Sequence, residues 1–268
     1  MKHAGLAAMA LGLWGLAAHG APPVTSGLKF HVRADVGVIT TGSNVLSWLD
    51  QSGNGVNVTN YAAAERPVLV NGALRDKPVV RFDGVTDLLN NLSTPLSSVI
   101  SSTDFTVFVV FKANRITQTG GAVWDQDMIL GDSAGYFGVV VQSNLASGVK
   151  SVSMYNYDSN GDVAGITNGF STTDYFLFIG SHGGGVLSAQ LRNGSPVTTA
   201  SGATGGMAGI LQVGKGYAAP GTAYFNGDIA EILIYNRLLT GAEIADVGNY
   251  LSTAWLRGPE KGTVIGFL

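Results

Sequence analysis

The chain has 268 residues and contains no cysteine. The fold therefore forms no disulfide bonds, and its stability depends on a hydrophobic core and on the hydrogen bonds between strands. Thiol chemistry is excluded as well, because no side chain can supply a thiolate.

Charged residues are scarce. Asp, Glu, Lys and Arg make up 12% of the chain, the formal net charge is −3, and no run of Lys or Arg occurs. A protein that follows a nucleic acid backbone needs a basic stripe or patch. The sequence therefore predicts no nucleic acid partner.

Long apolar runs are also missing, apart from one at the N-terminus. Residues 1–3, Met-Lys-His, precede the apolar run 4–18, and the small residues of 18–20 follow it. These three parts are typical of a secretory signal peptide, which we expect to span residues 1–20. The run is short for a membrane span of about 20 residues, and no second one follows. We therefore expect a mature chain that has no membrane span and is secreted, periplasmic or on the cell surface.

Glycine is abundant, with 38 residues scattered between short apolar runs rather than repeated at a fixed period. Such glycines suit many tight turns. The runs between them are rich in Val, Phe, Tyr and Ile, as strands are. We expect strands over 105–113, 136–142, 149–157, 175–181, 186–192, 195–199 and 209–214. Asn193-Gly194, between two of them, is the strongest hairpin signal in the chain.

The strand expected over 229–235 has two largely apolar faces. Alternation puts Ile229 and Glu231 on one face, and Ala230 and Ile232 on the other. A strand that is apolar on both faces is typical of the centre of a sheet, so we predict that position for it.

A helix is predicted after this strand. The apolar residues that recur there at helical spacing are Ile244, Val247, Leu251 and Trp255. Thr240 and Glu243 have the form of a capping box, which marks the start of the helix. We place Trp255 and Trp48 in the core.

The N-terminal part predicts shorter strands. Residues 28–34 alternate between apolar and polar side chains, as a half-buried strand does. The stretches 66–70 and 77–84 each begin near a proline, which is tolerated at the first position of a strand, and we expect both near a sheet edge. Alternating helices are absent. The predicted fold class is therefore all-β, a two-sheet antiparallel sandwich with one short C-terminal helix.

Four stretches of the sequence are similar to a known family. They are Trp48-Leu-Asp-Gln-Ser-Gly-Asn-Gly55, Arg66-Pro67, Pro78-Val-Val-Arg-Phe-Asp-Gly84 and the segment from Phe225 to Thr240. In this order they resemble the laminin-G-like domains of the concanavalin A-like lectin/glucanase superfamily, which are common in exported bacterial proteins. The resemblance covers residues 21–268 as one domain and implies a jelly-roll sandwich with one concave and one convex sheet. It implies function only weakly, because the same fold hosts lectins, glycan hydrolases, lyases and adhesion modules.

Carboxylate pairs that suit glycan cleavage are scarce. Laminarinase-like enzymes of this superfamily place Glu-x-Asp-x-Glu along one strand, so that alternate carboxylates act as nucleophile and acid. The glutamates after residue 20 are Glu65, Glu231, Glu243 and Glu260. None is paired with another at this spacing, and Asp228 and Glu231, three residues apart, are expected on opposite faces of their strand. Asp125 and Asp127 could share a face and form the best candidate pair, with an ordinary polar strand entrance as the alternative.

An esterase-like nucleophile motif is present in the wrong context. Gly131-Asp-Ser-Ala-Gly135 matches a Gly-x-Ser-x-Gly elbow, and His182-Gly-Gly-Gly185 matches an oxyanion loop. In α/β-hydrolase esterases that loop precedes the nucleophile and the elbow opens a helix, whereas here the loop follows and 136–141 is typical of a strand. We therefore expect both motifs to be turns, and Ser133 not to be a nucleophile.

Calcium is implied by the resemblance. Some relatives hold a structural calcium ion between an aspartate at the start of the closing strand and backbone carbonyls of an early turn. Asp228 matches that aspartate, and the turn at Asp83 and Gly84 could supply the carbonyls. We therefore keep Ca²⁺ as a candidate cofactor, with an ordinary turn residue as the alternative for Asp228.

Polar and aromatic residues of one predicted strand suggest a glycan site. Ser151, Ser153, Tyr155 and Tyr157 share one of its faces. Tyrosine rings can stack on sugars while their hydroxyls and nearby amides bind sugar hydroxyls. The candidate ligand-binding residues are Trp124, Tyr136, Gln142, Tyr155 and Tyr157. The alternative is that these tyrosines cover one face of the sandwich with their hydroxyls in water.

These observations predict an exported, non-catalytic module that binds a polysaccharide or cell-surface glycan, or that serves in adhesion. Two alternatives stay open. One is a glycan-cleaving hydrolase or lyase of the same fold, against which the missing glutamate motif argues. The other is a structural domain that contacts protein, and nothing in the sequence separates it from a glycan-binding module.

Overall fold

The structure is a computed structural model that describes most of the chain. The described residues are 20–101, 103–116, 118–119, 127–144, 150–156, 162–167, 169–202, 207, 209–216 and 224–257, with backbone alone at 118–119 and 143–144. The predicted signal peptide therefore lies outside the described residues, except for Gly20. None of the helices in these ranges is long and apolar enough to cross a membrane.

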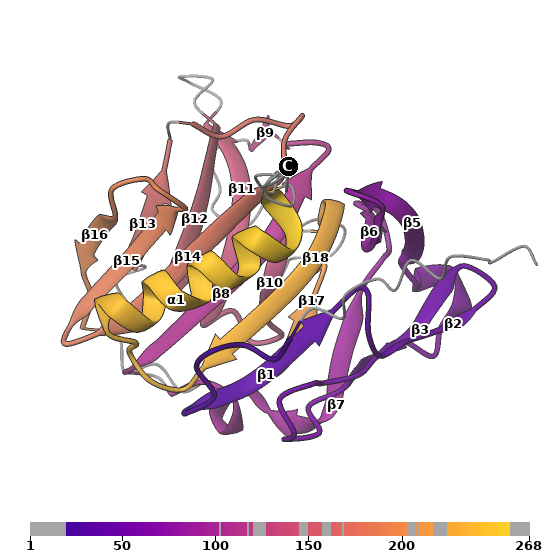
Figure 1. Ribbon diagram of the computed structural model, residues 1–268, viewed down its shortest axis with the longest axis horizontal. Helices are drawn as coiled ribbons and strands as arrows, with labels where there is room; N and C mark the ends of the chain where they lie inside the picture. The colour runs from indigo at the N-terminus through magenta and orange to yellow at the C-terminus, as the bar shows by residue number, and fades with distance from the viewer. Residues whose placement is uncertain are drawn as a thin grey trace, which may run out of the picture.

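Strands make up most of the regular structure (Figure 1). The first nine are β1 (Leu28–Arg33), β2 (Val38–Thr41), β3 (Asn44–Trp48), β4 (Val58–Thr59), β5 (Val68–Leu74), β6 (Lys77–Asp83), β7 (Leu89–Pro95), β8 (Phe105–Ala113) and β9 (Gln118–Thr119). The next nine are β10 (Asp127–Asp132), β11 (Phe137–Asn144), β12 (Lys150–Asn156), β13 (Asp162–Ile166), β14 (Phe176–Gly183), β15 (Val186–Leu191), β16 (Val197–Ala200), β17 (Ile210–Val213) and β18 (Asn226–Tyr235). The helical segments are η1 (Ala63–Glu65), η2 (Leu96–Ser98), α1 (Gly241–Leu251) and the π-helical η3 (Ser252–Leu256). The prediction of an all-β fold with a short C-terminal helix is confirmed.

Hydrogen-bonded pairing joins the eighteen strands of the described residues into one connected sheet. Two series of neighbours run through it. The first is β16-β15-β14-β8-β18, and the other side of β18 pairs with β6 and then with β1. The second is β13-β12-β11-β10-β17-β7-β4-β3-β2. β5 connects the series, because it pairs with β6 and, through Val68 and Asn44, with β3.

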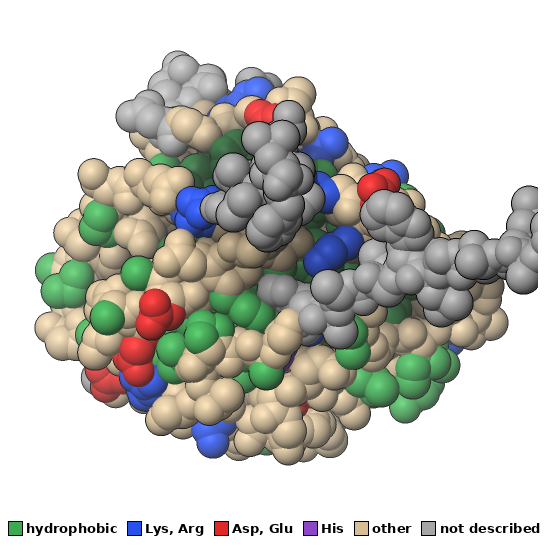
Figure 2. All heavy atoms as spheres, viewed as in Figure 1, with side chains coloured by type: hydrophobic (Ala, Val, Ile, Leu, Met, Phe, Trp, Pro, Cys, Tyr) green, Lys and Arg blue, Asp and Glu red, His purple; other side chains and the backbone are tan. Residues whose placement is uncertain are grey.

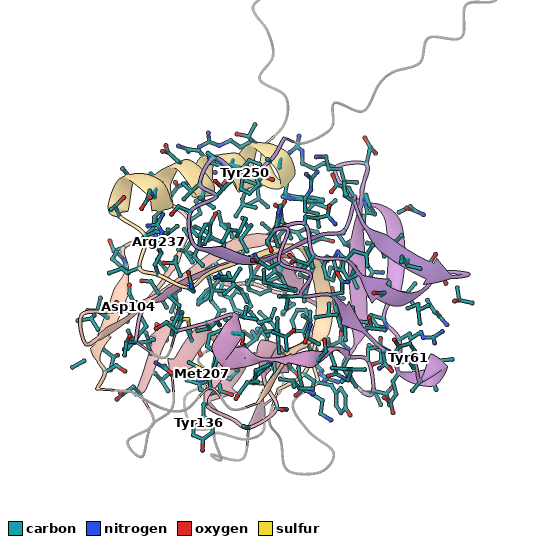
Figure 3. All side chains as sticks on the ribbon, turned by 90° about the horizontal axis from the view of Figure 1, so that it is seen from below. Tyr61, Asp104, Tyr136, Met207, Arg237 and Tyr250 are labelled. Atoms are coloured by element: carbon teal, nitrogen blue, oxygen red, sulfur yellow. The ribbon has the colours of Figure 1, made fainter. Side chains whose placement is uncertain are left out.

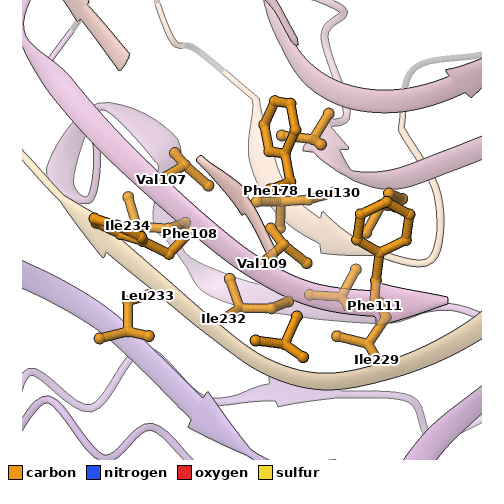
Figure 4. Close-up of a cluster of buried hydrophobic side chains, with 14 of the residues drawn as sticks. Val107, Phe108, Val109, Phe111, Leu130, Phe178, Ile229, Ile232, Leu233 and Ile234 are labelled. Atoms are coloured by element: carbon orange, nitrogen blue, oxygen red, sulfur yellow. The ribbon is translucent and has the colours of Figure 1, made fainter. Parts of the chain in front are cut away.

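The core lies between the two series. Phe105 of β8 and Phe137 of β11 meet edge to face, with ring centroids 5.5 Å apart. At Gly180 of β14 a Cβ atom would come 2.5 Å from Sδ of Met154 in β12, so the glycine lets the two strands approach closely. Figure 4 shows the buried apolar side chains of β8 and β18 at the centre of this core. β18 pairs on both sides, which confirms its predicted central position.

The C-terminal helical segment runs along the outer face of the first series (Figure 1). It begins at the predicted capping box, in which the Thr240 side chain accepts from the Glu243 backbone N–H and the Glu243 side chain accepts from the Thr240 backbone N–H. Val247, Leu251 and Trp255 are fully buried. The helical segment therefore covers the second face of the central strands, which explains why that face is apolar.

Strand β1 is not half-buried as its alternation predicts. His31 and Arg33 are only 2% and 6% exposed. His31 Nε2 lies 2.7 Å from Glu231 Oε1, a residue 200 positions away in the chain. The polar face of β1 is covered because it pairs with β18, over which the C-terminal helical segment packs.

The side chains of β18 also do not alternate regularly between its two faces. Its pairing with β8 shifts between Ile229 and Glu231, which forms a β-bulge. Asp228 and Glu231 therefore share a face, because their partners on β8 are two residues apart, and Ile229 shares the other face with Ile232. The predicted opposite orientation of Asp228 and Glu231 is wrong, because the extra residue of the bulge resets the alternation.

Strand β6 lies next to β5 and is not itself an edge strand, because it pairs with β5 on one side and with the first half of β18 on the other. Its proline, Pro78, is the second residue of the strand and precedes the ladder to β18, which starts at Val80. The missing N–H of Pro78 therefore removes no hydrogen bond to β18, so an inner strand can contain it.

Candidate functional site

One row of residues crosses seven strands of the second series at right angles to them. Its neighbours are register partners, in the order Tyr155, Gly138, Gly131, Gln212, Asn90, Thr59 and Ser47. Register partners point to the same side of a sheet, so all seven residues share one face. The adjacent residues Val139 and Met154 belong to the main core. These seven residues, which we call the transverse row, therefore face away from that core.

Tyr155 lies at one end of the transverse row and is half-buried. Its ring covers Gly138, where a Cβ atom would come 2.5 Å from Cε1 of the tyrosine. Its hydroxyl lies 3.9 Å from Sδ of Met128. Burial, and secondly the charge of Asp132, raises the pKa of the Tyr155 phenol. The phenol therefore stays protonated at neutral pH and can donate a hydrogen bond.

Gln142 lies on the same face as Tyr155. Its register partner is Ser151, and Ser153 lies between Ser151 and Tyr155 on β12, with the two serine hydroxyls 3.4 Å apart. The serines are buried, whereas Gln142 and Tyr155 are half-buried. The structure thus brings two of the predicted ligand-binding residues onto one face with polar neighbours.

Tyr136 lies in the turn before β11 and is half-buried, at the side of the molecule opposite α1 (Figure 3). Its backbone N–H donates to Oδ1 of Asp132 at 2.7 Å. Asp132 is fully buried, and burial raises the pKa of its carboxyl group. The other two predicted ligand-binding residues, Trp124 and Tyr157, lie outside the described residues.

The polar end of the transverse row was barely visible in the sequence. Gln212 Nε2 donates to Asn90 Oδ1 at 2.9 Å, and the hydroxyls of Ser47 and Thr59 lie 2.9 Å apart. A polar residue inside an apolar strand is a weak signal for Gln212. Asn90, Thr59 and Ser47 show no local sequence pattern of a site, because they come together only through the long-range pairing of β17, β7, β4 and β3.

Asp228, the predicted calcium ligand, is fully buried, and both of its side-chain oxygens have partners. Arg81 donates through Nε to Oδ1 at 2.6 Å and through Nη2 to Oδ2 at 2.9 Å. The Tyr175 hydroxyl donates to Oδ2 at 2.6 Å. The hydrogen bond that Arg81 donates to Asp228 raises the pKa of Arg81, while burial and then Asp228 raise the pKa of Tyr175. The carboxylate therefore already has two donors that compete with any cation.

Asp83 and Gly84 form the turn that follows β6. Asp83 Oδ1 accepts three backbone N–H groups of this turn, at 2.8, 3.0 and 3.1 Å. The Gly84 carbonyl accepts from Nη2 of Arg115 at 3.0 Å. No group of three or more His, Cys, Asp or Glu that could hold a metal ion occurs within the described ranges. A calcium ion at Asp228 with Asp83 and Gly84 stays a prediction.

Asp87, buried beside this turn, is expected to make stability depend on pH. Burial, to which the charge of Asp83 adds, raises the pKa of the Asp87 carboxyl group from 3.8 to about 6. The folded chain therefore binds this proton more tightly than the unfolded chain. The charged form of Asp87 therefore lowers the free energy of unfolding. This loss is absent below about pH 4 and grows to about 2–3 kcal/mol as the pH rises through about 6.

We therefore expect Asp87→Asn to be more stable than the parent chain at pH 8 and to lose this advantage at pH 4. The asparagine keeps an oxygen that can accept from the Asp83 backbone N–H, as Asp87 Oδ2 does at 2.9 Å. Urea unfolding of both chains at the two pH values measures the difference. A gain in stability that is equal at pH 4 and pH 8 would contradict the raised pKa of Asp87.

The esterase-like motifs each span the end of a strand and the turn after it, and they form no catalytic pair. His182 is 2% exposed, and neither of its ring nitrogens has a hydrogen-bond partner. Ser133 therefore has no hydrogen bond to this histidine. Asp127 is 2% exposed and pairs with Arg115 at 3.1 Å, and its candidate partner Asp125 lies outside the described residues.

Glu231 connects the C-terminal helical segment to the sheet. It is fully buried, and its Oε1 lies 2.7 Å from His31 Nε2 and accepts from the Tyr250 hydroxyl at 3.2 Å. Its Oε2 accepts from Nε1 of Trp255 at 2.5 Å. The carboxylate thus joins β18 to β1, α1 and η3. Its burial and its partners suit a structural role rather than contact with a ligand.

Comparison with known proteins places this geometry in a family. A model described as the concanavalin A-like lectin/glucanases superfamily matches residues 88–245. The binding domain of Paraclostridial Mosquitocidal Protein 1 is similar in structure, with a TM-score of 0.57 and 12% identity over 85% of this chain and 53% of that chain. Trypanosoma rangeli sialidase in complex with sialic acid gives a TM-score of 0.57 and 12% identity over 89% of this chain and 35% of the sialidase.

A third structure is domain 4 of AbnA, an extracellular arabinanase of Geobacillus stearothermophilus, in complex with arabinotriose. It gives a TM-score of 0.48 and 14% identity over 83% of this chain and 98% of that domain. Among curated protein sequences, none matches the chain. The chain spans about half of the mosquitocidal binding domain and about a third of the sialidase. At these identities the likeness to solved structures concerns the fold alone.

Proposed function

Because the chain belongs to the concanavalin A-like lectin/glucanase superfamily, we propose that it is an exported module that binds a polysaccharide or cell-surface glycan without cleaving it. The transverse row is the observation that supports this function. It carries an aromatic ring at one end and paired amides and hydroxyls at the other. Sugar binding combines these two kinds of contact.

The middle of the transverse row is buried and separates two half-buried ends. At Gly131 and Gly138 a Cβ atom would come 2.8 and 2.7 Å from Cε of Met128, so the methionine covers positions that have no side chains of their own. A glycan chain that lies across the strands would therefore contact the half-buried Tyr155 at one end of the row and the half-buried Asn90 and Thr59 at the other.

We also infer that the two series of strands are the two sheets of a jelly-roll sandwich. The facing positions of β8 and β11, with Phe105 against Phe137, support this arrangement. So does the narrow link between the series, in which β5 meets β3 at the single pair of Val68 and Asn44. The transverse row then lies on the outer face of one sheet, and the C-terminal helical segment lies on the outer face of the other.

The test is affinity electrophoresis of the chain from Ala21 onward through gels that contain a panel of neutral and acidic polysaccharides. The same mixtures are assayed for new reducing ends, and each gel is run with and without a calcium chelator. We expect retardation without new reducing ends. New reducing ends would favour the glycan-cleaving alternative, and loss of retardation with chelator would support a calcium ion at Asp228.

Tyr155→Ala is expected to weaken the binding of the retarding polysaccharide about tenfold or more, because it removes a ring with its stacking surface. The matched control is Tyr61→Ala, since Tyr61 is 73% exposed and lies outside the transverse row. Dissociation constants from retardation at several polysaccharide concentrations measure both variants. Equal affinities of Tyr155→Ala and the parent chain would show that the site lies elsewhere.

A further inference from the structure

Six basic residues lie at the C-terminal end of the helical segment or on the sheet face that carries it. We call them the basic cluster; they are Arg75, Lys77, Arg81, Lys112, Arg192 and Arg257. Figure 2 shows several Lys and Arg side chains in the upper part of this face, with some Asp or Glu side chains among them. The whole chain has a formal net charge of −3, so the basic cluster is a local excess of positive charge.

Three members of the basic cluster contact the end of the helical segment. Arg75 Nη1 donates to the carbonyl oxygen of Leu256 at 3.3 Å. Lys77 Nζ lies 4.9 Å from the ring centre of Trp255. Arg192 Nη2 donates to Oδ1 of Asn249 at 3.1 Å. These contacts place the three cations around η3 and the last turn of α1.

Two further members, Arg81 and Lys112, lie on strands β6 and β8. Arg81 and Lys112 are the register partners of Asp228 on its two sides, so the three residues share the face that carries the helical segment. Their strands, β6 and β8, are two strand spacings apart, or about 10 Å. Tyr175 continues this line beside Lys112, whose Nζ lies 5.8 Å from the ring centre.

Most cations of the basic cluster have no ion-pair partner among the described residues. Arg81 pairs with Asp228, but its side chain remains 45% exposed. No ion pair of the other five cations occurs among the described residues, and the exposed carboxylates Asp76 and Asp174 form none with them. Burial and then the charge of Arg257 lower the pKa of Arg192, so these two cations repel each other.

The helix dipole explains only part of the basic cluster. Cations near a helix C-terminus interact favourably with its free carbonyl groups, as Arg75 does with Leu256. This effect falls off within the last turn, and Lys112 instead lies on the sheet beside Asp228. A set of partly exposed cations, of which only Arg81 has an ion pair in the described part of the chain, is suited to an external anion.

We propose that the basic cluster binds an anionic polysaccharide through repeated carboxylate groups, on the face opposite the transverse row. The cations are spread over a surface rather than directed into one pocket, which fits charges repeated along a polymer better than a single small anion. Guanidinium groups match planar carboxylates in geometry, and the Tyr175 ring adds a surface for a sugar. This site is separate from the transverse row and can exist whether or not the proposed function is correct.

The test uses polygalacturonate as the carboxylated polymer and its fully methyl-esterified form as the uncharged counterpart. The test variant is Lys77→Gln with Lys112→Gln. The matched control is Lys29→Gln with Lys150→Gln, which lowers the net charge equally at two cations on β1 and β12 that have no ion pair within the described part of the chain. Melting temperatures check that all three chains fold.

We expect the parent chain and the control to bind polygalacturonate more weakly as salt increases, and the test variant to lose about tenfold or more in affinity at low salt. Tyr155→Ala should bind this polymer like the parent chain. Absence of binding, equal binding of the esterified polymer, or an equal loss in test and control variants would overturn the proposal. So would binding to vesicles that contain phosphatidylglycerol without binding to polygalacturonate.

Discussion

Replacing Glu231 with alanine is expected to lower the free energy of unfolding by about 3–5 kcal/mol, the range for removing one partner of a buried ionic group. The carboxylate is fully buried and serves His31, Tyr250 and Trp255 at distances of 2.5 to 3.2 Å. Its removal takes the shared acceptor from three buried or half-buried groups and leaves a cavity beneath the helical segment.

Urea unfolding followed by tryptophan fluorescence measures this loss, because Trp255 is one of the partners of Glu231. The matched control is Glu65→Ala at an exposed position, which is expected to change stability by no more than about 0.5 kcal/mol. A loss below about 1 kcal/mol for Glu231→Ala would contradict the role assigned to the carboxylate.

The buried contacts of Glu231 matter for function as well as for stability. In glycan-cleaving relatives, alternate carboxylates of one strand project toward the substrate. In this chain the bulge in β18 puts Asp228 and Glu231 on one face, but that face lies under or beside the C-terminal helical segment. Both carboxylates are 0% exposed and are bound by their own side-chain donors. They are therefore unavailable to a glycan in this arrangement.

Local features of the fold were predictable from the sequence because they depend on neighbouring residues. The capping box at Thr240 and Glu243 forms as its spacing indicates. The hairpin at Asn193 and Gly194 forms between β15 and β16, with Asn193 at a positive φ of 62°. Trp48 and Trp255 are both fully buried, as predicted.

Features that depend on distant partners were not predictable in this way. The bulge at Ile229 changes which residues share a face, and no local pattern marks it. The burial of His31 follows from a carboxylate 200 residues away. The transverse row likewise requires the registers of seven strands at once, so the sequence suggested Tyr155 as a ligand-binding residue but not Asn90.

Gly227→Ala is expected to destabilise the chain by about 3 kcal/mol or more, at the upper end of the range for overpacking a core. Gly227 lies inside the central ladder, paired with Ala113 of β8 and Phe82 of β6. A Cβ atom there would overlap the backbone carbonyl oxygen of Lys112 and the ring of Phe225. The carbonyl cannot move aside without separating β8 from β18, so flexible side-chain adjustment offers little relief.

The matched control is Gly241→Ala at the first position of α1, where a Cβ atom would have nothing within 4 Å. Alanine suits a helix better than glycine and restricts the unfolded chain, so this variant should gain up to about 1 kcal/mol. Urea unfolding of both variants measures effects of opposite sign from the same chemical change. If Gly227→Ala were as stable as Gly241→Ala, the close contact of β8 and β18 at this point, and with it the placement of Asp228 beside Lys112, would be wrong.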